Sequence, residues 1–296
     1  MKKTLLVKKL FIGLFLLSFI SCMEQETVDL KYFYDYDKHY PLNVVIDTLS
    51  SNLFHISYNS VHNNRVTALL SFPKTGKKPY PLAIIQHGLG DSKDTDYMVL
   101  GDSILSSKGF AVFRIDFAMH GERVKKEYKF KGIDYTLRDA IEQTVFDLRR
   151  GLDYLDTLPE IDSTKTGYIG ISLGGIAGTV FCGVDKRVEV PVICIAGGGM
   201  RAMEGVEGFG DKVTAMMAPI EPLNFVKGIS PRPILFINAE DDEIIPKPMA
   251  MLLHAKAEEP KEVIWYKSKH HINPYAAFND AADWLIKNLG LEKQQK

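Results

Sequence analysis

The chain has 296 residues, of which 46% are hydrophobic and 25% charged, and its formal net charge is −1. This composition is ordinary for a soluble globular protein, and the length is ample for a buried core of one large or two small domains. A chain without basic runs argues against nucleic acid as a partner. Cys182 and Cys194 lie in apolar stretches, which favours buried thiols over a disulfide.

The first residues have the pattern of an export signal. MKKTLLVKK is positively charged, and the apolar run LFIGLFLLSFI is too short to span a bilayer comfortably, so residues 1–21 are predicted to be a signal peptide. Ser21-Cys22 resembles a bacterial lipoprotein cleavage site, with Cys22 as the acylated residue, although Phe19 stands where leucine is usual. Plain secretion and an uncleaved anchor are the alternatives. Cleavage would remove four lysines and no acids, leaving a more acidic mature chain.

Residues 22–43, rich in Tyr and Asp, are expected to form a tether or an irregular segment leading into a domain over residues 44–296. The domain opens with FHISYNS and RVTALLSFP, which alternate apolar and polar residues on either side of Asn63 and Asn64. This pattern predicts an antiparallel hairpin.

Short strand-like runs then alternate with helical segments to the end of the chain. The predicted strands are, in order, LAIIQ, FAVFRID, TGYIGI, VPVICIAG, PILFINA and EVIWYK. The predicted helices are TDYMVLGDSILSSKGF, TLRDAIEQTVFDLRRGLDYL, GGIAGTVFC, KPMAMLLHAKA and YAAFNDAADWLIKNL. The second helix places one apolar face inward, formed by Leu137, Ile141, Val145, Leu148, Leu152 and Leu155. Such alternation predicts one α/β domain with a mostly parallel central sheet and helices on both faces.

A candidate nucleophile lies between a predicted strand and a predicted helix. In GYIGISLGG, Ser172 directly follows TGYIGI, and Gly170 and Gly174 keep side chains out of the turn. A sharp strand-to-helix turn of this kind presents a serine hydroxyl at the edge of a sheet. An incidental serine in a tight turn is the alternative.

A serine hydroxyl needs a base that removes its proton and an acid that orients the base. After PILFINA, the loop EDDEIIP offers several acids, and after EVIWYK, the loop SKHHINP offers His270 and His271. Both loops follow predicted strands, and the carboxyl ends of parallel strands gather functional residues. The residues alone leave any one of Glu240, Asp241, Asp242 and Glu243 open as the acid, and either histidine open as the base.

The chemistry also requires two backbone N–H groups that bind the oxygen gaining charge. The residue after the serine, Leu173, is one expected donor. The loop HGLG after an early strand supplies the other at Leu89, because Gly88 and Gly90 allow the backbone to turn its amide inward.

Taken together, these motifs resemble the α/β-hydrolase superfamily, in the style of its dienelactone-hydrolase-like and prolyl-oligopeptidase-like esterases. The resemblance runs from about residue 50 to the end and rests on HGLG, RIDFAMHGER, GISLGG, PRPILFINAEDDEIIP and WYKSKHHINP. It implies that Asp242 is the acid and His270 the base, with Asp241 and His271 as alternates. Ala239 and Lys269 stand where relatives usually carry glycine. By the same resemblance, His87, Asp116, His120, Gly121 and Arg123 shape the loops of the site.

The resemblance implies a serine hydrolase that cleaves small carboxylic esters, such as acetyl esters, through an acyl-enzyme. The alternatives are a prolyl-oligopeptidase-like peptidase and a non-catalytic surface-binding lipoprotein. No cofactor or metal is expected, because GISLGG lacks a Walker lysine and no cluster has ligand spacing. The expected partner is a small ester, with membrane contact only through the N-terminal lipid. The expected localisation is exported: anchored in a bacterial membrane, or otherwise periplasmic or secreted. A segment rich in Gly and Met, residues 197–230, is expected near the pocket.

Overall fold

The computed structural model describes residues 30–124, 135–200 and 216–291. Residues 30–33 belong to a separate N-terminal unit and contain the short 3-10 helix η1 (Leu30–Tyr32). The compact unit begins at Tyr34, so the irregular stretch 34–43 is part of it. Within this stretch Tyr34 is buried and donates a hydrogen bond to the Pro219 carbonyl oxygen at 2.7 Å.

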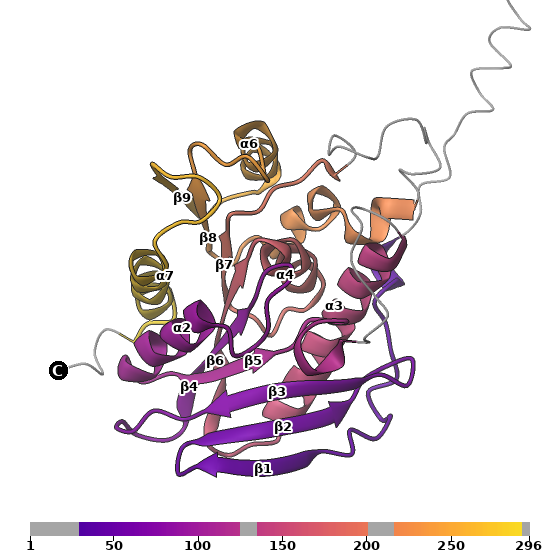
Figure 1. Ribbon diagram of the computed structural model, residues 1–296, viewed down its shortest axis with the longest axis vertical. Coiled ribbons are helices and arrows are strands. Elements are labelled where there is room, and N and C mark those ends of the chain that lie inside the picture. Colours follow the sequence, from indigo (N-terminus) through magenta and orange to yellow (C-terminus); the bar gives the residue numbers. More distant parts are fainter. Residues whose placement is uncertain (1–29, 125–134, 201–215, 292–296) are drawn as a thin grey trace, which may run out of the picture. The chain divides into compact units, whose positions relative to one another are not determined.

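The compact unit is built on a nine-stranded sheet with the order β1-β2-β3-β5-β4-β6-β7-β8-β9 (Figure 1). Neighbouring strands pair antiparallel from β1 through β2 and β3 to β5. Every pairing from β5 through β4 to β9 is parallel. In chain order the strands are β1 (Val45–Ser50), β2 (Leu53–Asn59), β3 (Arg65–Ser71), β4 (Tyr80–Gln86), β5 (Ala111–Ile115), β6 (Ile161–Ile171), β7 (Val190–Cys194), β8 (Ile234–Ala239) and β9 (Lys261–Tyr266).

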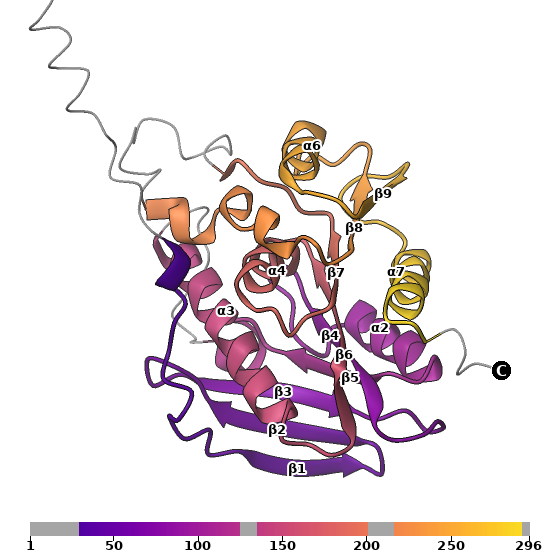
Figure 2. The ribbon, with the colours of Figure 1, turned by 180° about the vertical axis from the view of Figure 1, so that it is seen from behind.

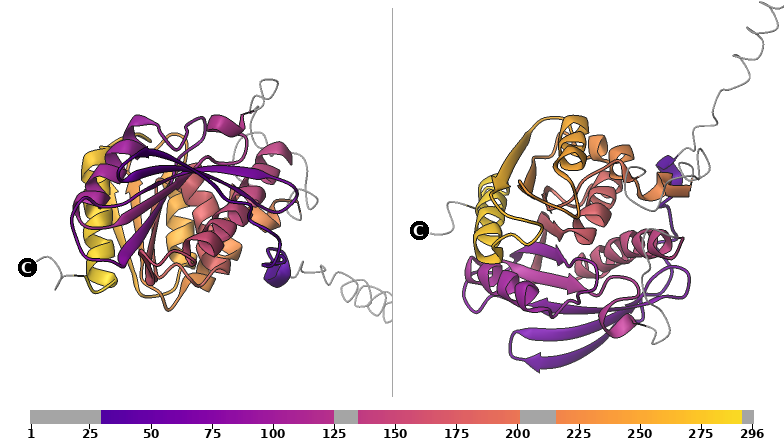
Figure 3. Two further views of the ribbon diagram at one scale, coloured as in Figure 1. Left: turned by 90° about the horizontal axis from the view of Figure 1, so that it is seen from below. Right: turned by 45° about the horizontal axis from the view of Figure 1, so that its top comes forward.

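Helices cover both faces of this sheet. α3 and α4 pack together on one face, and α2 and α7 pack together on the other (Figures 1 and 2). The two layers lie on opposite sides of the strands in Figure 3. The helices are α2 (Asp96–Ser107), α3 (Tyr135–Leu155), α4 (Leu173–Val184), α6 (Lys247–Lys256) and α7 (Pro274–Asn288), with the 3-10 helices η2 (Gly121–Arg123), η4 (Ala218–Ile220), η5 (Pro222–Asn224) and η6 (Val226–Ile229).

Three of the parallel strands are buried along their whole length, as expected for parallel strands covered on both faces. Every residue of β4, β7 and β8 is buried, and the predicted apolar face of α3 is buried as well. The predicted hairpin is confirmed as the pair β2 and β3, whose register runs from Leu53↔Ser71 to Asn59↔Arg65. The predicted fold class is therefore confirmed, with the edge strand β1 added to it.

Candidate active site

Ser172 lies at the junction of β6 and α4 in a strained backbone conformation. Its φ is 53° and its ψ is −112°, and its N–H donates a hydrogen bond to the Cys194 carbonyl oxygen at 2.9 Å. A side chain at Gly170 would place its Cβ 2.4 Å from the Gly174 oxygen, and one at Gly174 would place it 2.4 Å from the Gln86 oxygen. Both glycines are therefore required by close backbone approach, which is the steric role predicted for them.

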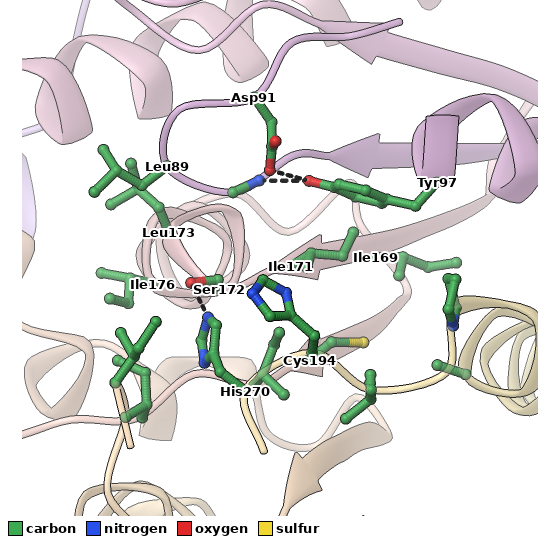
Figure 4. A pocket seen from close by; sticks show the side chains of 18 of the residues that line it. Leu89, Asp91, Tyr97, Ile169, Ile171, Ser172, Leu173, Ile176, Cys194 and His270 are labelled. Atoms are coloured by element: carbon green, nitrogen blue, oxygen red, sulfur yellow. Dashed lines mark hydrogen bonds between the residues drawn. The ribbon is translucent and has the colours of Figure 1, made fainter. Parts of the chain in front are cut away.

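A continuous chain of hydrogen bonds joins Ser172 to His270 and Asp242. The distance from Ser172 Oγ to His270 Nε2 is 3.1 Å, and His270 Nδ1 lies 2.8 and 2.9 Å from the two Asp242 carboxylate oxygens (Figure 4 shows the Ser172–His270 bond). Because a carboxylate can only accept, Nδ1 carries the ring proton and Nε2 is left to accept the serine hydroxyl. This is the arrangement that a serine nucleophile needs.

The loops after β8 and β9 hold these two side chains in place. Asp242 and His270 are both less than a tenth exposed. Asp242 Oδ1 also accepts the backbone N–H groups of Ile244 and Ile245, at 2.9 and 2.8 Å. These bonds fix the carboxylate in the orientation in which it meets the imidazole.

The two alternate residues occupy different positions. Asp241 is exposed, and its backbone N–H donates to the Ser268 carbonyl oxygen at 3.0 Å. The His271 ring lies 5.7 Å from the His270 ring, centroid to centroid, and borders the cavity beside Ser172. The hydrogen-bonded chain runs through Asp242 and His270, so these two are the better candidates for acid and base.

The expected oxyanion donors come from two separate segments beside the serine. Leu89 lies in the loop after β4, Leu173 is the first residue of α4, and both border the cavity (Figure 4). The loop approaches the serine closely, because a Cβ at Gly88 would lie 3.5 Å from Ser172 Cβ. The N-terminal amides of α4 have no partner within the helix and are free to bind an anion. Their role as an oxyanion hole stays a prediction.

Asp91 and Tyr97 are site residues that the sequence did not single out. The Gly88 N–H donates to Tyr97 Oη at 3.0 Å, and Tyr97 Oη donates to Asp91 Oδ2 at 2.8 Å (Figure 4). Together they hold the loop that carries Leu89. Burial is the main reason why the pKa of Tyr97 is raised, so the phenol keeps its proton. The only signal in the sequence that could have found this site was the polar residue Tyr97 in the first turn of the helix that follows HGLG.

Buried polar residues also support the loop after β4 that carries Leu89. His87 Nδ1 donates to the Gly88 carbonyl oxygen at 2.8 Å, and its Nε2 accepts the Phe117 N–H at 3.0 Å. Burial lowers the pKa of His87 to about 4, which keeps the ring in the neutral form that these two bonds need. Asp116 accepts the backbone N–H of Lys93 at 3.0 Å and binds its ammonium group at 2.7 Å. These contacts agree with the loop-shaping role predicted for His87 and Asp116.

Ser172 opens onto a cavity of about 480 Å³. Leu89 and Ile244, both about half exposed, border it, and so do residues that are buried in the core. The lining residues are Gly88, Leu89, Asp91, Tyr97, Leu137, Ile169, Ile171, Ser172, Leu173, Ile176, Cys194, Ile195, Met200, Ile244, Ile245, His270, His271, Ile272, Pro274, Ala277 and Phe278. A cavity of this size is typical of small-molecule sites.

Cys182 and Cys194 are buried free thiols, as predicted, and burial raises the pKa of each to about 12. Within the part of the chain that the structure describes, no group of three or more His, Cys, Asp or Glu side chains could hold a metal ion. Over the same residues, no helix has the length and apolar character needed to cross a membrane. The predicted signal peptide, Cys22 and residues 201–215 of the Gly- and Met-rich segment lie outside the described residues.

None of the protein-family models matches this chain. The Bacillus subtilis protein named "Putative hydrolase YtaP" is 27% identical over 133 residues, which is 40% of this chain and only 44% of that protein's length. Among solved structures, the acetyl xylan esterase from Paenibacillus sp. R4 has a TM-score of 0.73 at 18% identity, covering 88% of this chain and 95% of that one.

Two further structures agree with that comparison. A cold-adapted esterase from an Arctic intertidal metagenomic library has a TM-score of 0.64 at 20% identity, covering 83% of this chain and 98% of that one. The alpha/beta hydrolase GrgF from Penicillium sp. sh18 also reaches 0.64, at 15% identity, covering 80% and 99%. The protein therefore has the α/β-hydrolase fold. Its serine stands at the strand-to-helix turn where this fold presents a nucleophile.

Proposed function

We propose that this protein is a serine hydrolase that cleaves carboxylic esters through an acyl-enzyme. The observation that carries the proposal is the hydrogen-bonded chain from Ser172 through His270 to Asp242 in the wall of a largely apolar cavity. The solved structures named as esterases support the same chemistry by analogy of fold.

The proposed reaction follows from the proton positions. Ser172 Oγ attacks the ester carbonyl carbon while its proton passes to His270 Nε2, and the amides of Leu89 and Leu173 bind the oxyanion. Collapse of the tetrahedral intermediate breaks the bond between the carbonyl carbon and the alcohol oxygen, and this oxygen takes the proton from His270 Nε2. Water then attacks the acyl carbon while its proton passes to His270 Nε2, and the bond from that carbon to Ser172 Oγ breaks. Ser172 Oγ takes the proton from His270, and the carboxylic acid is released. Asp242 holds the imidazole in the tautomer that each step needs. Acetyl esters are among the small substrates of this class.

The test is covalent labelling with a fluorophosphonate probe, together with turnover of p-nitrophenyl acetate. Wild-type protein is expected to be labelled and active, and Ser172→Ala to lose both properties. Ser103→Ala, at an exposed serine of α2, is the matched control and should behave as wild type. Absence of labelling, or labelling that persists in Ser172→Ala, would contradict the enzyme proposal and favour a binding protein on a hydrolase scaffold.

We further propose that the chain is exported and held at a bacterial membrane through lipid on Cys22. The support is the charged and apolar pattern of residues 1–21 followed by Ser21-Cys22. Cys22→Ala is expected to move the full chain from the membrane fraction to the soluble fraction. Cys182→Ala, which removes a buried thiol instead, should leave the partition unchanged. An equal distribution of wild type and Cys22→Ala would remove the lipid-anchor proposal.

A further inference from the structure

One part of the cavity extends away from Ser172 along the face of the sheet that α7 covers. Its walls are Ile169 and Ile171 of β6, Cys194 of β7, and Ala277 and Phe278 of α7, and we call this part the apolar arm. Figure 4 shows Ile171, Ile169 and Cys194 lying to one side of Ser172, opposite Leu173 and Ile176.

The walls of the apolar arm belong to the protein core. Ile169, Cys194, Ala277 and Phe278 are between 1% and 6% exposed and are members of the hydrophobic cluster between the sheet and helices α2 and α7. Residues so deeply buried ordinarily contact other protein atoms on every side. Here they also border the cavity onto which Ser172 opens, so the arm is lined by side chains of the core.

The chemistry of the walls is uniformly neutral. Four of them present hydrocarbon, and the fifth is the Cys194 thiol, whose pKa burial raises to about 12, so that it stays protonated. Atoms that line an empty apolar space lose dispersion contacts, and water in such a space finds few hydrogen-bonding partners. A hydrocarbon group from a ligand would restore those contacts, and its transfer out of water into the arm is itself favourable.

The arm is also rigid. A Cβ on Gly101 of α2 would lie 2.5 Å from the Phe278 ring, so α2 and α7 are in direct contact through that ring. Phe278 is therefore held against α2, and small Ala277 beside it leaves the space open. The core cannot close this space without moving α7, which is packed against both α2 and the sheet.

We propose that the apolar arm binds a neutral aliphatic or aromatic group of the ester substrate that is larger than the methyl group of an acetyl ester. The inference rests on the proposed function and names its substrate class: esters in which one side is a medium-length hydrocarbon group. The acyl group and the alcohol group are two sources of the same chemistry. A charged group there would lose its hydration without finding a partner.

Two ester series separate these sources. The first varies the acyl group as p-nitrophenyl acetate, butanoate and hexanoate, and the second varies the alcohol as methyl, butyl and hexyl acetate. We expect kcat/KM to rise at least about tenfold along one series. A rise along the first series assigns the arm to the acyl group, and a rise along the second assigns it to the alcohol. Flat or falling values along both series would overturn the inference.

Ala277→Leu tests the location directly, because the added side chain fills the arm. We expect it to reduce the preference for the six-carbon over the short-chain ester, in whichever series showed the rise, about tenfold. Ala276→Leu is the matched control: Ala276 is a half-buried neighbour on the same helix that does not border the cavity, so the preference should not change. Cys194→Leu fills the arm from the opposite wall and should act as Ala277→Leu does, with circular dichroism verifying the fold.

The outcomes also separate this inference from the function on which it rests. Loss of all ester turnover together with absence of Ser172-dependent labelling in wild-type protein contradicts the proposed function. Ester hydrolysis with no chain-length preference, or a preference that survives in both correctly folded filling variants, contradicts the apolar arm alone.

Discussion

Ser172 combines a left-handed backbone conformation with a hydrogen bond from its own N–H to the Cys194 carbonyl oxygen. A non-glycine residue in such a conformation costs about 1–3 kcal/mol, and it persists only where the surroundings enforce it. Here the enforcing contacts are backbone atoms of β4, which leave no space for a Cβ at Gly174. In this conformation, the hydroxyl of Ser172 points toward His270.

Asp242→Asn is expected to reduce kcat/KM by about a thousandfold or more. An amide presents an N–H where the carboxylate accepts one, so it no longer selects the tautomer in which Nε2 is free for Ser172. The measurement is steady-state turnover of p-nitrophenyl acetate. Asp241→Asn changes the exposed neighbour in the same loop and should stay within about twofold of wild type. A large loss in Asp241→Asn with a small one in Asp242→Asn would reverse the assignment of the acid.

The residues of the hydrogen-bonded chain could be predicted because Ser172 directly follows a strand-like run, and Asp242 and His270 lie in short loops just after two others. Choosing Asp242 over Asp241 required the family resemblance, since adjacent acids in one loop have the same pattern. Asp91 and Tyr97 were missed for a physical reason. Tyr97 accepts the Gly88 N–H and donates to Asp91, and no periodicity or motif in a sequence indicates which side chain bonds a loop amide.

At the scale of elements, β6 and α4 form the unit that carries the nucleophile. The Tyr168 ring of β6 packs under α4, and its hydroxyl donates to the Gly174 carbonyl oxygen at 2.7 Å. A Cβ on Gly178 would lie 2.1 Å from this ring, so the glycine sets how closely the helix approaches the strand. The position of α4 on the sheet therefore depends on Gly178.

Gly178→Ala is expected to lower the free energy of unfolding by about 2 kcal/mol. Alanine favours a helix by about 1 kcal/mol over glycine, but the collision with a fully buried ring outweighs that gain. Urea denaturation followed by circular dichroism measures the change. Ser103→Ala, an exposed helix position, should stay within about 0.5 kcal/mol of wild type. A Gly178→Ala protein as stable as wild type would show that this helix can shift freely.

β1 is the one strand of the described sheet that the sequence did not predict. All six of its residues are exposed, and it pairs only through its contact with β2 at the edge. A strand without a buried face has no alternation of apolar and polar residues, so periodicity carries no signal for it. By contrast, β4, β7 and β8 are short, largely apolar runs, and every one of their residues is buried.

At the scale of the whole molecule, buried neutral histidines make stability depend on pH. Burial lowers the pKa of His87 and of His254 to about 4 each, and it lowers the pKa of His120 as well. Each ring binds a proton more readily in the unfolded chain, where the pKa is about 6.5. The stabilising contribution is therefore complete above pH 6.5 and is lost as the pH falls toward 4.

For His87 alone, the free energy of unfolding is expected to fall by about 2 kcal/mol between pH 7 and pH 5. Urea denaturation at the two pH values measures the decrease, which the other two histidines enlarge in the wild type. His87→Gln should show a decrease smaller by about that amount, whatever its stability at pH 7. His39→Gln, at an exposed histidine, is the control. The same pH dependence in His87→Gln and wild type would contradict the role of burial.

The base of the proposed reaction comes from the loop between β9 and α7, 98 residues after the serine in the chain. During synthesis, the ribosome therefore releases the serine turn long before the imidazole that would activate it. A nascent or prematurely ended chain has the nucleophile without its proton acceptor. The proposed ester cleavage would begin only when β9 has joined the sheet, so the order of translation delays it until this strand and the loop after it have been made.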